Sequence, residues 1–371
     1  MSNLIASTPA QRQVAQSRLE QYIAQGQARA VGLQERILRE IPTDAVAKSE
    51  VLQFRALEPG FSASSPAGIT VALGNQGGEN RYAIHRHALG HLAEQAKMPM
   101  AYADHLLTQG QWGADLLARN LNDGVRLGQP KSRYLVRRVG TEVRAVLSSK
   151  FRRIDARPIL DTLIGEAQRA GAIVVDGRGS DIRVEMKFIV PKIFEPAPGE
   201  FMVFGFAWSN SDFGAGANNL RAFANRLACW NGMTMEQALR QVHLGRQLTD
   251  DVEWSQQTLE LDTRTAVSAA RDTARALLSE VKIAETAEKI TRAAEEGIDP
   301  KAKLESLKKR VSKTDAKEIA DAFNSPDVVN LPAGNTMWRF SNAISLVARD
   351  AENVDRKLEL ERLAGDVLKA A

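Results

Sequence analysis

The chain has 371 residues, a formal net charge of +4, a hydrophobic content of 44% and a single cysteine, Cys229. This composition excludes global disorder, an intramolecular disulfide and a metal site built from several cysteines. No segment reaches the ~18 consecutive apolar residues of a membrane span, and the N-terminus lacks a secretory signal, so we expect a cytoplasmic protein without membrane contact.

The first predicted element is a long polar helix over residues 9–40. Ser7 and Thr8 are candidate N-cap residues, and Pro9 suits the first helical position. The apolar stripe of this helix is thin, which is more typical of a docking or oligomer-contact helix than of a core helix. We therefore assign residues 1–50 to an N-terminal segment that contacts a partner or another copy of the chain.

Residues 51–250 are predicted to form an α+β core. The expected elements are strands at 51–57 and 69–73, two helices within 84–122, a hairpin at 133–148, a helix at 156–170, and strands at 172–177, 181–190 and 200–208. This order favours a central antiparallel sheet with packed helices. Residues 219–231 are ambiguous between strand and helix. The two helices within 84–122 could form a helix-turn-helix reader, but the second is not basic, which favours an αα corner packed on the core.

The hairpin is predicted from two β-rich runs that flank Gly140. Because side chains alternate along a strand, one face is expected to be apolar and the other to be an exposed face lined by arginine. The apolar face would carry Tyr134, Val136, Val143, Ala145 and Leu147, and the outer face Arg133, Arg137, Glu142 and Arg144. Residues 131–160 hold nine basic and two acidic residues, a surplus larger than the net charge of the whole chain. Such a concentration is the electrostatic footprint of a polyanion site.

Basic side chains beside aromatic rings on a sheet match the needs of single-strand binding. Cations neutralise phosphates, and rings offer a stacking platform worth ~1–3 kcal/mol per base. The candidate nucleic-acid-binding residues are Arg133, Tyr134, Arg137, Arg138, Arg144, Lys150, Phe151, Arg152, Arg153 and Arg157. The alternative interpretation is an ordinary solvated surface whose arginines pair with carboxylates elsewhere in the chain.

The C-terminal part is rich in Ala, Glu, Lys and Leu and is predicted to be helical from about residue 255. We divide it into a charged helical segment at 251–325 and a linker followed by a C-terminal helix at 326–371. We expect these helices, with the N-terminal helix, to supply contacts between subunits.

Three histidines, His85, His87 and His91, suggest a metal site, because His87 and His91 are four residues apart on one helical face. A third ligand is not evident at the usual spacing. A polar helix face is the favoured interpretation, and we expect no bound metal. Whether these histidines bind anything else stays open.

Other patterns that could indicate catalysis are incomplete. Cys229 and His243 could form a thiol nucleophile, but lone cysteines beside apolar residues are usually inert. The glycine-rich run at 214–219 lacks the lysine of a P-loop and the spacing of a dinucleotide-binding loop. The carboxylates near strands that could hold Mg²⁺ are Asp176, Asp181 and Glu185. We therefore expect neither an enzyme nor a cofactor.

Four segments of the chain resemble a phage- and plasmid-encoded family, the domain of unknown function numbered 932. They are RYLVRR followed by VRAVLSSKFRRID, then NSDFGAG, RLACWNGM and NTMWRFSNAIS. The resemblance spans roughly residues 80–350, and its sharpest parts are 149–155, 229–232 and 335–338. The chain departs from the family pattern in the Ala- and Arg-rich stretch before Cys229 and in Arg339-Phe340. The long first helix lies outside the match.

The resemblance implies a mobile-element context and no agreed activity. Phages and plasmids commonly carry single-strand annealing proteins, which form rings and bind DNA in a basic groove, and the order of elements here is similar to theirs. The leading hypothesis is an oligomeric single-stranded-DNA-binding, annealing-type recombination protein. The alternatives are a mobile-element factor that counters a host defence by binding a protein partner, and an enzyme acting on nucleic acid. DNA or RNA preference and oligomer size stay open.

Overall fold

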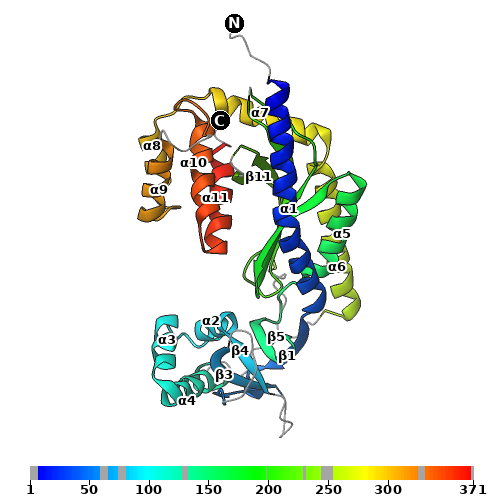
Figure 1. The fold of residues 1–371 in the computed structure, drawn as a ribbon. Coiled ribbons are helices and arrows are strands. Elements are labelled where there is room, and N and C mark those ends of the chain that lie inside the picture. The colour runs from blue at the N-terminus through cyan, green and yellow to red at the C-terminus, as the bar shows by residue number, and fades with distance from the viewer. Residues whose placement is uncertain are drawn as a thin grey trace.

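The computed structural model describes residues 7–58, 66–73, 81–127, 133–197, 199–228, 231–243, 254–324 and 331–368. The described elements form two lobes, seen in Figure 1 one above the other. Residues 43–148 make up the small lobe, which holds one sheet. The long first helix and the residues from 156 onward make up the large lobe, which holds the other. Among the described residues, the chain enters the small lobe after the first helix and leaves it after β6 (Glu142–Ser148).

The small lobe is a mixed sheet with helices on one face. Its strands are β1 (Thr43–Lys48), β2 (Leu52–Ala56), β3 (Pro66–Leu73), β4 (Arg81–His85), β5 (Arg133–Val139) and β6 (Glu142–Ser148), in the order β1-β5-β6-β4-β3-β2. Neighbours are antiparallel except β4 and β6, which are parallel. The helical elements are α2 (Arg86–Gln95), α3 (Met100–Thr108), α4 (Gly110–Leu121), the 3₁₀ turn η1 (Ser49–Val51) and the π-helical turn η2 (Asn122–Leu127). Alternate residues of β2 are buried, as expected of a strand with one face on a core.

The large lobe is built on an antiparallel sheet in the order β11-β10-β9-β8-β7. The strands are β7 (Ile173–Ser180), β8 (Arg183–Ile189), β9 (Met202–Asn210), β10 (Asn218–Arg226) and β11 (Asn231–Gln241). One face is aromatic, with the rings of Phe188 and Phe206 stacked at 4.5 Å beside the buried Trp208. The opposite face carries polar residues such as Lys187, whose partner Glu361 belongs to the C-terminal helix.

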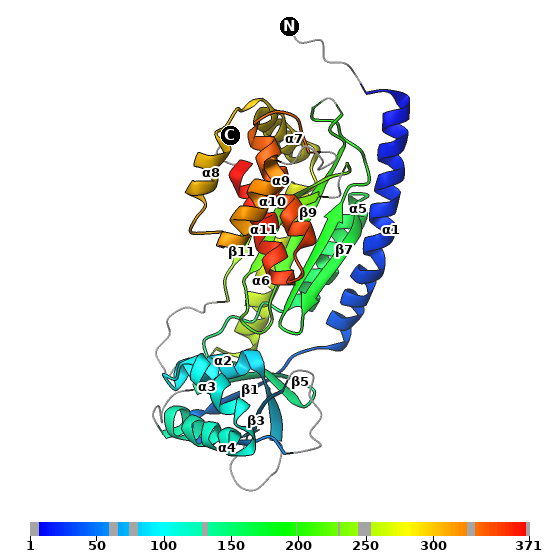
Figure 2. The same cartoon turned by 60° about the vertical axis from the view of Figure 1, so that its left-hand side comes forward.

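Helices surround this sheet, as Figure 2 shows. They are α1 (Pro9–Arg39), α5 (Ala156–Arg169), α6 (Gln256–Leu277), α7 (Glu280–Glu295), α8 (Pro300–Ser306), α9 (Lys313–Asn324), α10 (Met337–Asp350) and α11 (Val354–Val367). Thr8 caps α1 by accepting a hydrogen bond from the Gln11 backbone N–H, and Pro9 is the first helical residue. The 31 residues of α1 span about 46 Å. A Cβ atom at Gly26 would lie 1.6 Å from the carbonyl oxygen of Val175, so glycine is required where α1 crosses β7.

The predicted α+β class with helical N- and C-terminal extensions is confirmed. The strands expected in one central sheet are divided between two sheets, so residues 51–250 contribute to both lobes. The ambiguous segment 219–231 is strand as far as Arg226, and the predicted last helix is interrupted at 351–353. None of the described helices is long and apolar enough to cross a bilayer.

Candidate nucleic-acid interface

Strands β5 and β6 form the predicted hairpin, but their pairing contains a β-bulge. Arg137 lies opposite Ala145, whereas the next residue, Arg138, lies opposite Val143. Arg144 is therefore the extra residue of the bulge. A bulge leaves one residue unpaired and reverses the alternation of side chains beyond it.

The bulge changes which residues share a face. The prediction that Ala145 and Leu147 lie on the same face as Val143 is wrong beyond this point. Val146 instead joins Val143 in the apolar core beneath the helices of the small lobe. The arginine face of the hairpin is consequently the face that meets the large lobe.

Arg137 is buried at the junction between the lobes, with 1% of its surface exposed. Its Nε donates to Asp44 at 2.7 Å, and its Nη2 donates to Asp155 at 2.8 Å. Its Nη1 donates to the carbonyl oxygen of Asp212 at 2.7 Å. Burial lowers the pKa of Arg137, but the charges of Asp155 and Asp44 outweigh it and raise that pKa above its ordinary value. The prediction that Arg137 faces solvent is wrong, because its guanidinium is buried and donates hydrogen bonds to acceptors within the protein.

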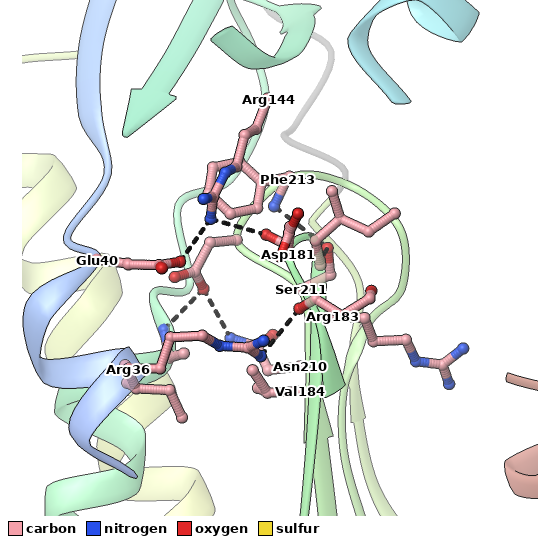
Figure 3. Close-up of a pocket in the computed structure, with 14 residues that line it drawn as sticks. Arg36, Glu40, Arg144, Asp181, Arg183, Val184, Asn210, Ser211 and Phe213 are labelled. Carbon is pink, nitrogen blue, oxygen red and sulfur yellow. Dashed lines mark hydrogen bonds and ion pairs between the residues drawn. The ribbon is translucent and has the colours of Figure 1, made fainter. Parts of the chain in front are cut away.

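Arg144 is buried at the same junction, with 5% of its surface exposed. Figure 3 shows its side chain reaching from the small lobe towards Glu40 and Asp181. Its Nη1 donates to Glu40 at 2.7 Å and to the carbonyl oxygen of Asp181 at 3.0 Å, and its Nε donates to Glu142 at 3.3 Å. The cavity around it measures about 30 Å³. The expected exposure of Arg144 and of Glu142 is therefore also wrong.

Two arginines that follow the hairpin are paired as well. The Nε and Nη2 atoms of Arg152 donate to the two carboxylate oxygens of Asp262 in α6, at 2.6 and 2.7 Å. Arg153 lies 2.9 Å from Asp44, the carboxylate that also holds Arg137. These ion pairs match the alternative interpretation of the basic segment, in which its arginines are matched by distant acids.

The two aromatic candidates have different surroundings. Tyr134 is 5% exposed and belongs to the core of the small lobe, so its predicted place on the apolar face of the hairpin is confirmed. Of its two expected roles, stacking on bases is excluded and seating the hairpin fits this position. Phe151 is half-buried, and its ring stacks on His243 with centroids 4.8 Å apart and planes at 3°. Burial lowers the pKa of His243, which favours a neutral ring in this stack.

Four candidate cations keep accessible positions. Arg157 is exposed on α5, and Arg133, Arg138 and Lys150 are half-buried, as are the ion-paired Arg152 and Arg153. The guanidinium of Arg138 lies 4.8 Å from the centre of the Tyr82 ring. Lys150 lies close to Arg133 in the fold, because the Ser149 N–H next to it donates to the Arg133 carbonyl oxygen at 3.3 Å.

The junction also holds a carboxyl group with a shifted pKa. Burial, and then the charge of Asp155, raise the pKa of Asp212 to about 7. One of its carboxyl oxygens accepts a hydrogen bond from the Ala156 N–H at 2.8 Å. Sequence reasoning missed the acids of this junction, Asp44, Asp155 and Asp212, because nothing in the local sequence indicates that they meet.

The three histidines have structural contacts. His85 caps α2 by accepting a hydrogen bond from the His87 N–H at 3.0 Å, and His87 bonds to the carbonyl oxygen of Phe213 at 2.9 Å. The His91 ring accepts a bond from the Val146 N–H at 3.4 Å. Burial, and then His87, lower the pKa of His91 to about 4. Within the described ranges no group of three or more His, Cys, Asp or Glu side chains could hold a metal ion.

The remaining candidates from the sequence are a cysteine, a glycine-rich run and three carboxylates near strands. Cys229 lies outside the described residues. The glycine-rich run before β10 is ordered by Ser211, whose hydroxyl accepts from the N–H groups of Phe213 and Ala215. Asp176, one of the carboxylates considered for Mg²⁺, is paired with arginine.

Comparison with known proteins found no matching family model, no matching curated protein and no matching solved structure. The resemblance to the domain of unknown function numbered 932 stays a prediction.

Proposed function

We propose that this chain binds single-stranded DNA as an annealing-type recombination protein, through a smaller basic surface than the sequence suggested. The observation that carries the proposal is the basic surplus of residues 131–160, from which we select four described cations that are exposed or half-buried. They are Arg133, Arg138, Lys150 and Arg157. Annealing needs phosphate neutralisation and alignment of strands, and it needs neither a nucleophile nor a nucleotide.

The buried arginines are excluded from this surface on energetic grounds. Moving Arg137 or Arg144 onto a phosphate would break the three hydrogen bonds that each makes at the junction, two of them to carboxylates, in exchange for one phosphate contact. A hydrogen bond to a charged group contributes about 1.5–3 kcal/mol. The exchange is therefore unfavourable, and these two arginines hold the lobes together instead of binding DNA.

The smaller surface predicts a shallow salt dependence. Four phosphate contacts on a single strand give a slope of about −3 in a plot of log K against log salt concentration, whereas seven would give about −5. Fluorescence anisotropy with a labelled single strand of about 40 nucleotides and with its duplex, between about 50 and 300 mM salt, measures this slope. The single strand should bind more tightly than the duplex.

Variants separate the proposed surface from general electrostatics. The double variant Lys150→Gln, Arg157→Gln should weaken binding and make the slope shallower by about 1.4. The matched control is Lys313→Gln, Lys317→Gln, which removes two exposed cations of α9. Equal loss in both variants would show non-specific attraction. Absence of binding at low salt would sink the proposal and favour the protein-partner alternative.

Self-association is the second part of the proposal, with another copy of this chain as the partner of α1. Val31 and Leu38 lie seven residues apart on one side of α1 and are 53% and 38% exposed. Ile41 follows just beyond the helix at 51%. Val31 and Leu38 form an exposed apolar strip on this side of the helix.

We expect size-exclusion chromatography with light scattering to show an oligomer. Replacing Val31 and Leu38 with Glu should dissociate it, because the substitutions place charges in the contact. Val281→Glu is the control, since Val281 is 71% exposed on α7. A monomer at all concentrations would contradict self-association.

A further inference from the structure

A polar cavity of about 270 Å³ lies in the large lobe, on the face of the sheet turned towards α1 and α11. In Figures 1 and 2 these two helices flank the strands of that sheet. The volume is many times the ~10–15 Å³ that one ordered water needs. None of the cations proposed above for DNA binding lines it, so a ligand bound in this cavity would be independent of the proposed function.

Positive charge dominates the wall of the cavity. The lining cations are Arg29, Arg178, Lys187, Arg349 and Lys357, and the lining carboxylates are Asp176 and Glu361. Asp176 accepts hydrogen bonds from Arg29 and Arg178, both at 2.9 Å. Glu361 accepts one from Lys187 at 2.5 Å. Both carboxylates of the wall are thus already engaged by cations of the wall other than Lys357.

Lys357 also lines the cavity, and unlike an exposed lysine it is buried. Its Nζ donates to the carbonyl oxygen of Arg349 at 2.8 Å, and it has no ion pair among the described residues. Burial, followed by repulsion from Arg178, lowers the pKa of Lys357 to about 8, although the charge of Glu361 acts in the opposite direction. Glu361 and Asp176 only partly offset the cost of burying this ammonium group, and a bound anion would lower that cost further.

Two further groups in the wall lack hydrogen-bond partners. The Oδ1 of Asn225 and the Oγ of Ser345 are buried without a partner, and both residues are 1% exposed. Both residues line the cavity. Unpartnered buried polar groups are rare in native proteins and call for a ligand, water or ion. The serine hydroxyl can donate, whereas the asparagine oxygen can only accept.

We propose that this cavity binds a phosphate-type oxyanion that also carries a hydroxyl group, either inorganic phosphate or a small phosphate monoester. Its oxygens would accept hydrogen bonds from Lys357 and Ser345. Its hydroxyl group would donate to the Oδ1 of Asn225. Sulfate has a similar size and charge but carries no hydroxyl group at neutral pH, so it satisfies the donors and leaves Asn225 unpartnered.

Isothermal titration calorimetry of the full chain at pH 7 tests this site, with inorganic phosphate, glycerol phosphate and sulfate at matched ionic strength. Saturable binding of a phosphate species is expected, with sulfate about tenfold weaker. Lys357→Gln should weaken phosphate binding about tenfold or more, because it removes a charge-assisted hydrogen bond. Lys317→Gln, which removes an exposed lysine of α9, should leave it unchanged. Tighter binding of inorganic phosphate would identify the free ion as the ligand, and tighter binding of glycerol phosphate would identify a phosphate monoester.

A second readout does not depend on measuring heat. Lys357→Met removes the buried cation, so it should raise the melting temperature without phosphate and abolish the further rise that phosphate gives the unsubstituted chain. The absence of saturable phosphate binding, or unchanged binding by Lys357→Gln, would overturn the site. Equal affinity for sulfate and phosphate would overturn the role of the hydroxyl group and of Asn225.

Discussion

Replacing Arg137 with alanine is expected to lower the free energy of unfolding by about 1.5–3 kcal/mol, because it removes charge-assisted hydrogen bonds from a buried guanidinium to the half-buried Asp44 and Asp155. Arg137 joins Asp44 and Asp155, and it also donates to the backbone of Asp212. Guanidinium chloride titration followed by far-ultraviolet circular dichroism measures the change. Arg157→Ala is the control, since exposed substitutions usually change stability by less than about 0.5 kcal/mol.

Arg137→Lys provides an independent test should the alanine variant fail to fold. Lysine keeps the charge but lacks the planar fork that reaches several acceptors at once. We expect a loss smaller than that of Arg137→Ala and larger than that of Arg157→Ala. If Arg137→Ala proved as stable as the control, Arg137 would not be holding the junction together.

Acid is expected to destabilise the protein through His91 by about 3 kcal/mol as the pH falls from 7 to about 4. The folded state holds the pKa of His91 at about 4, against 6.5 ordinarily. Between these values the unfolded chain binds the proton and the folded chain does not. This contribution is therefore complete above pH 6.5 and is lost as the pH falls through 4.

Asp212 changes the stability of the protein with pH in the opposite direction to His91. The contribution of His91 is therefore measured by comparing a His91 variant with the unsubstituted chain. The pKa of Asp212 is raised to about 7 in the folded state, so its contribution to stability falls as the pH rises from 4 towards 7. We expect His91→Gln to lose less stability than the unsubstituted chain between pH 7 and 4.5 in urea titrations. The control is His105→Gln, which alters an exposed histidine of α3. Parallel curves for all three proteins would refute the role of His91.

The elements that sequence analysis located were those with a strong local signal. Strands β8 and β9 are rich in β-branched and aromatic residues, and Pro191 lies two residues beyond the end of the first of them. Strand β10 was ambiguous because it buries Asn218 and Arg226, which look like surface residues. Their partners are distant in sequence: Asn218 accepts from Trp208, and Arg226 pairs with Glu200. A strand whose polar residues are satisfied by such partners has no recognisable alternation.

The candidate site was predicted less well, for a related reason. Counting charges located the basic segment, but it could not show whether solvent or a distant acid surrounds each arginine. Arg144 binds Glu142 nearby in the sequence, but its shorter ion pair is with Glu40, more than a hundred positions away. The β-bulge at Arg144 contains no glycine that would have indicated it in the sequence. Solvent exposure of a charged residue is a property of the folded chain, and local sequence carries little information about it.

The route of the chain through the junction has a consequence for the architecture as a whole. Asp44 lies where the chain arrives in the small lobe and Asp155 where it has returned, and one guanidinium group binds both. From the side of the large lobe, the intervening hundred or so residues are a single closed loop, whose closure entropy grows only slowly with its length. Sites whose two ends meet are those at which whole domains can be inserted or removed. The small lobe therefore has the topology of an inserted domain. Replacing or deleting it would leave the order and connections of the elements in the large lobe unchanged.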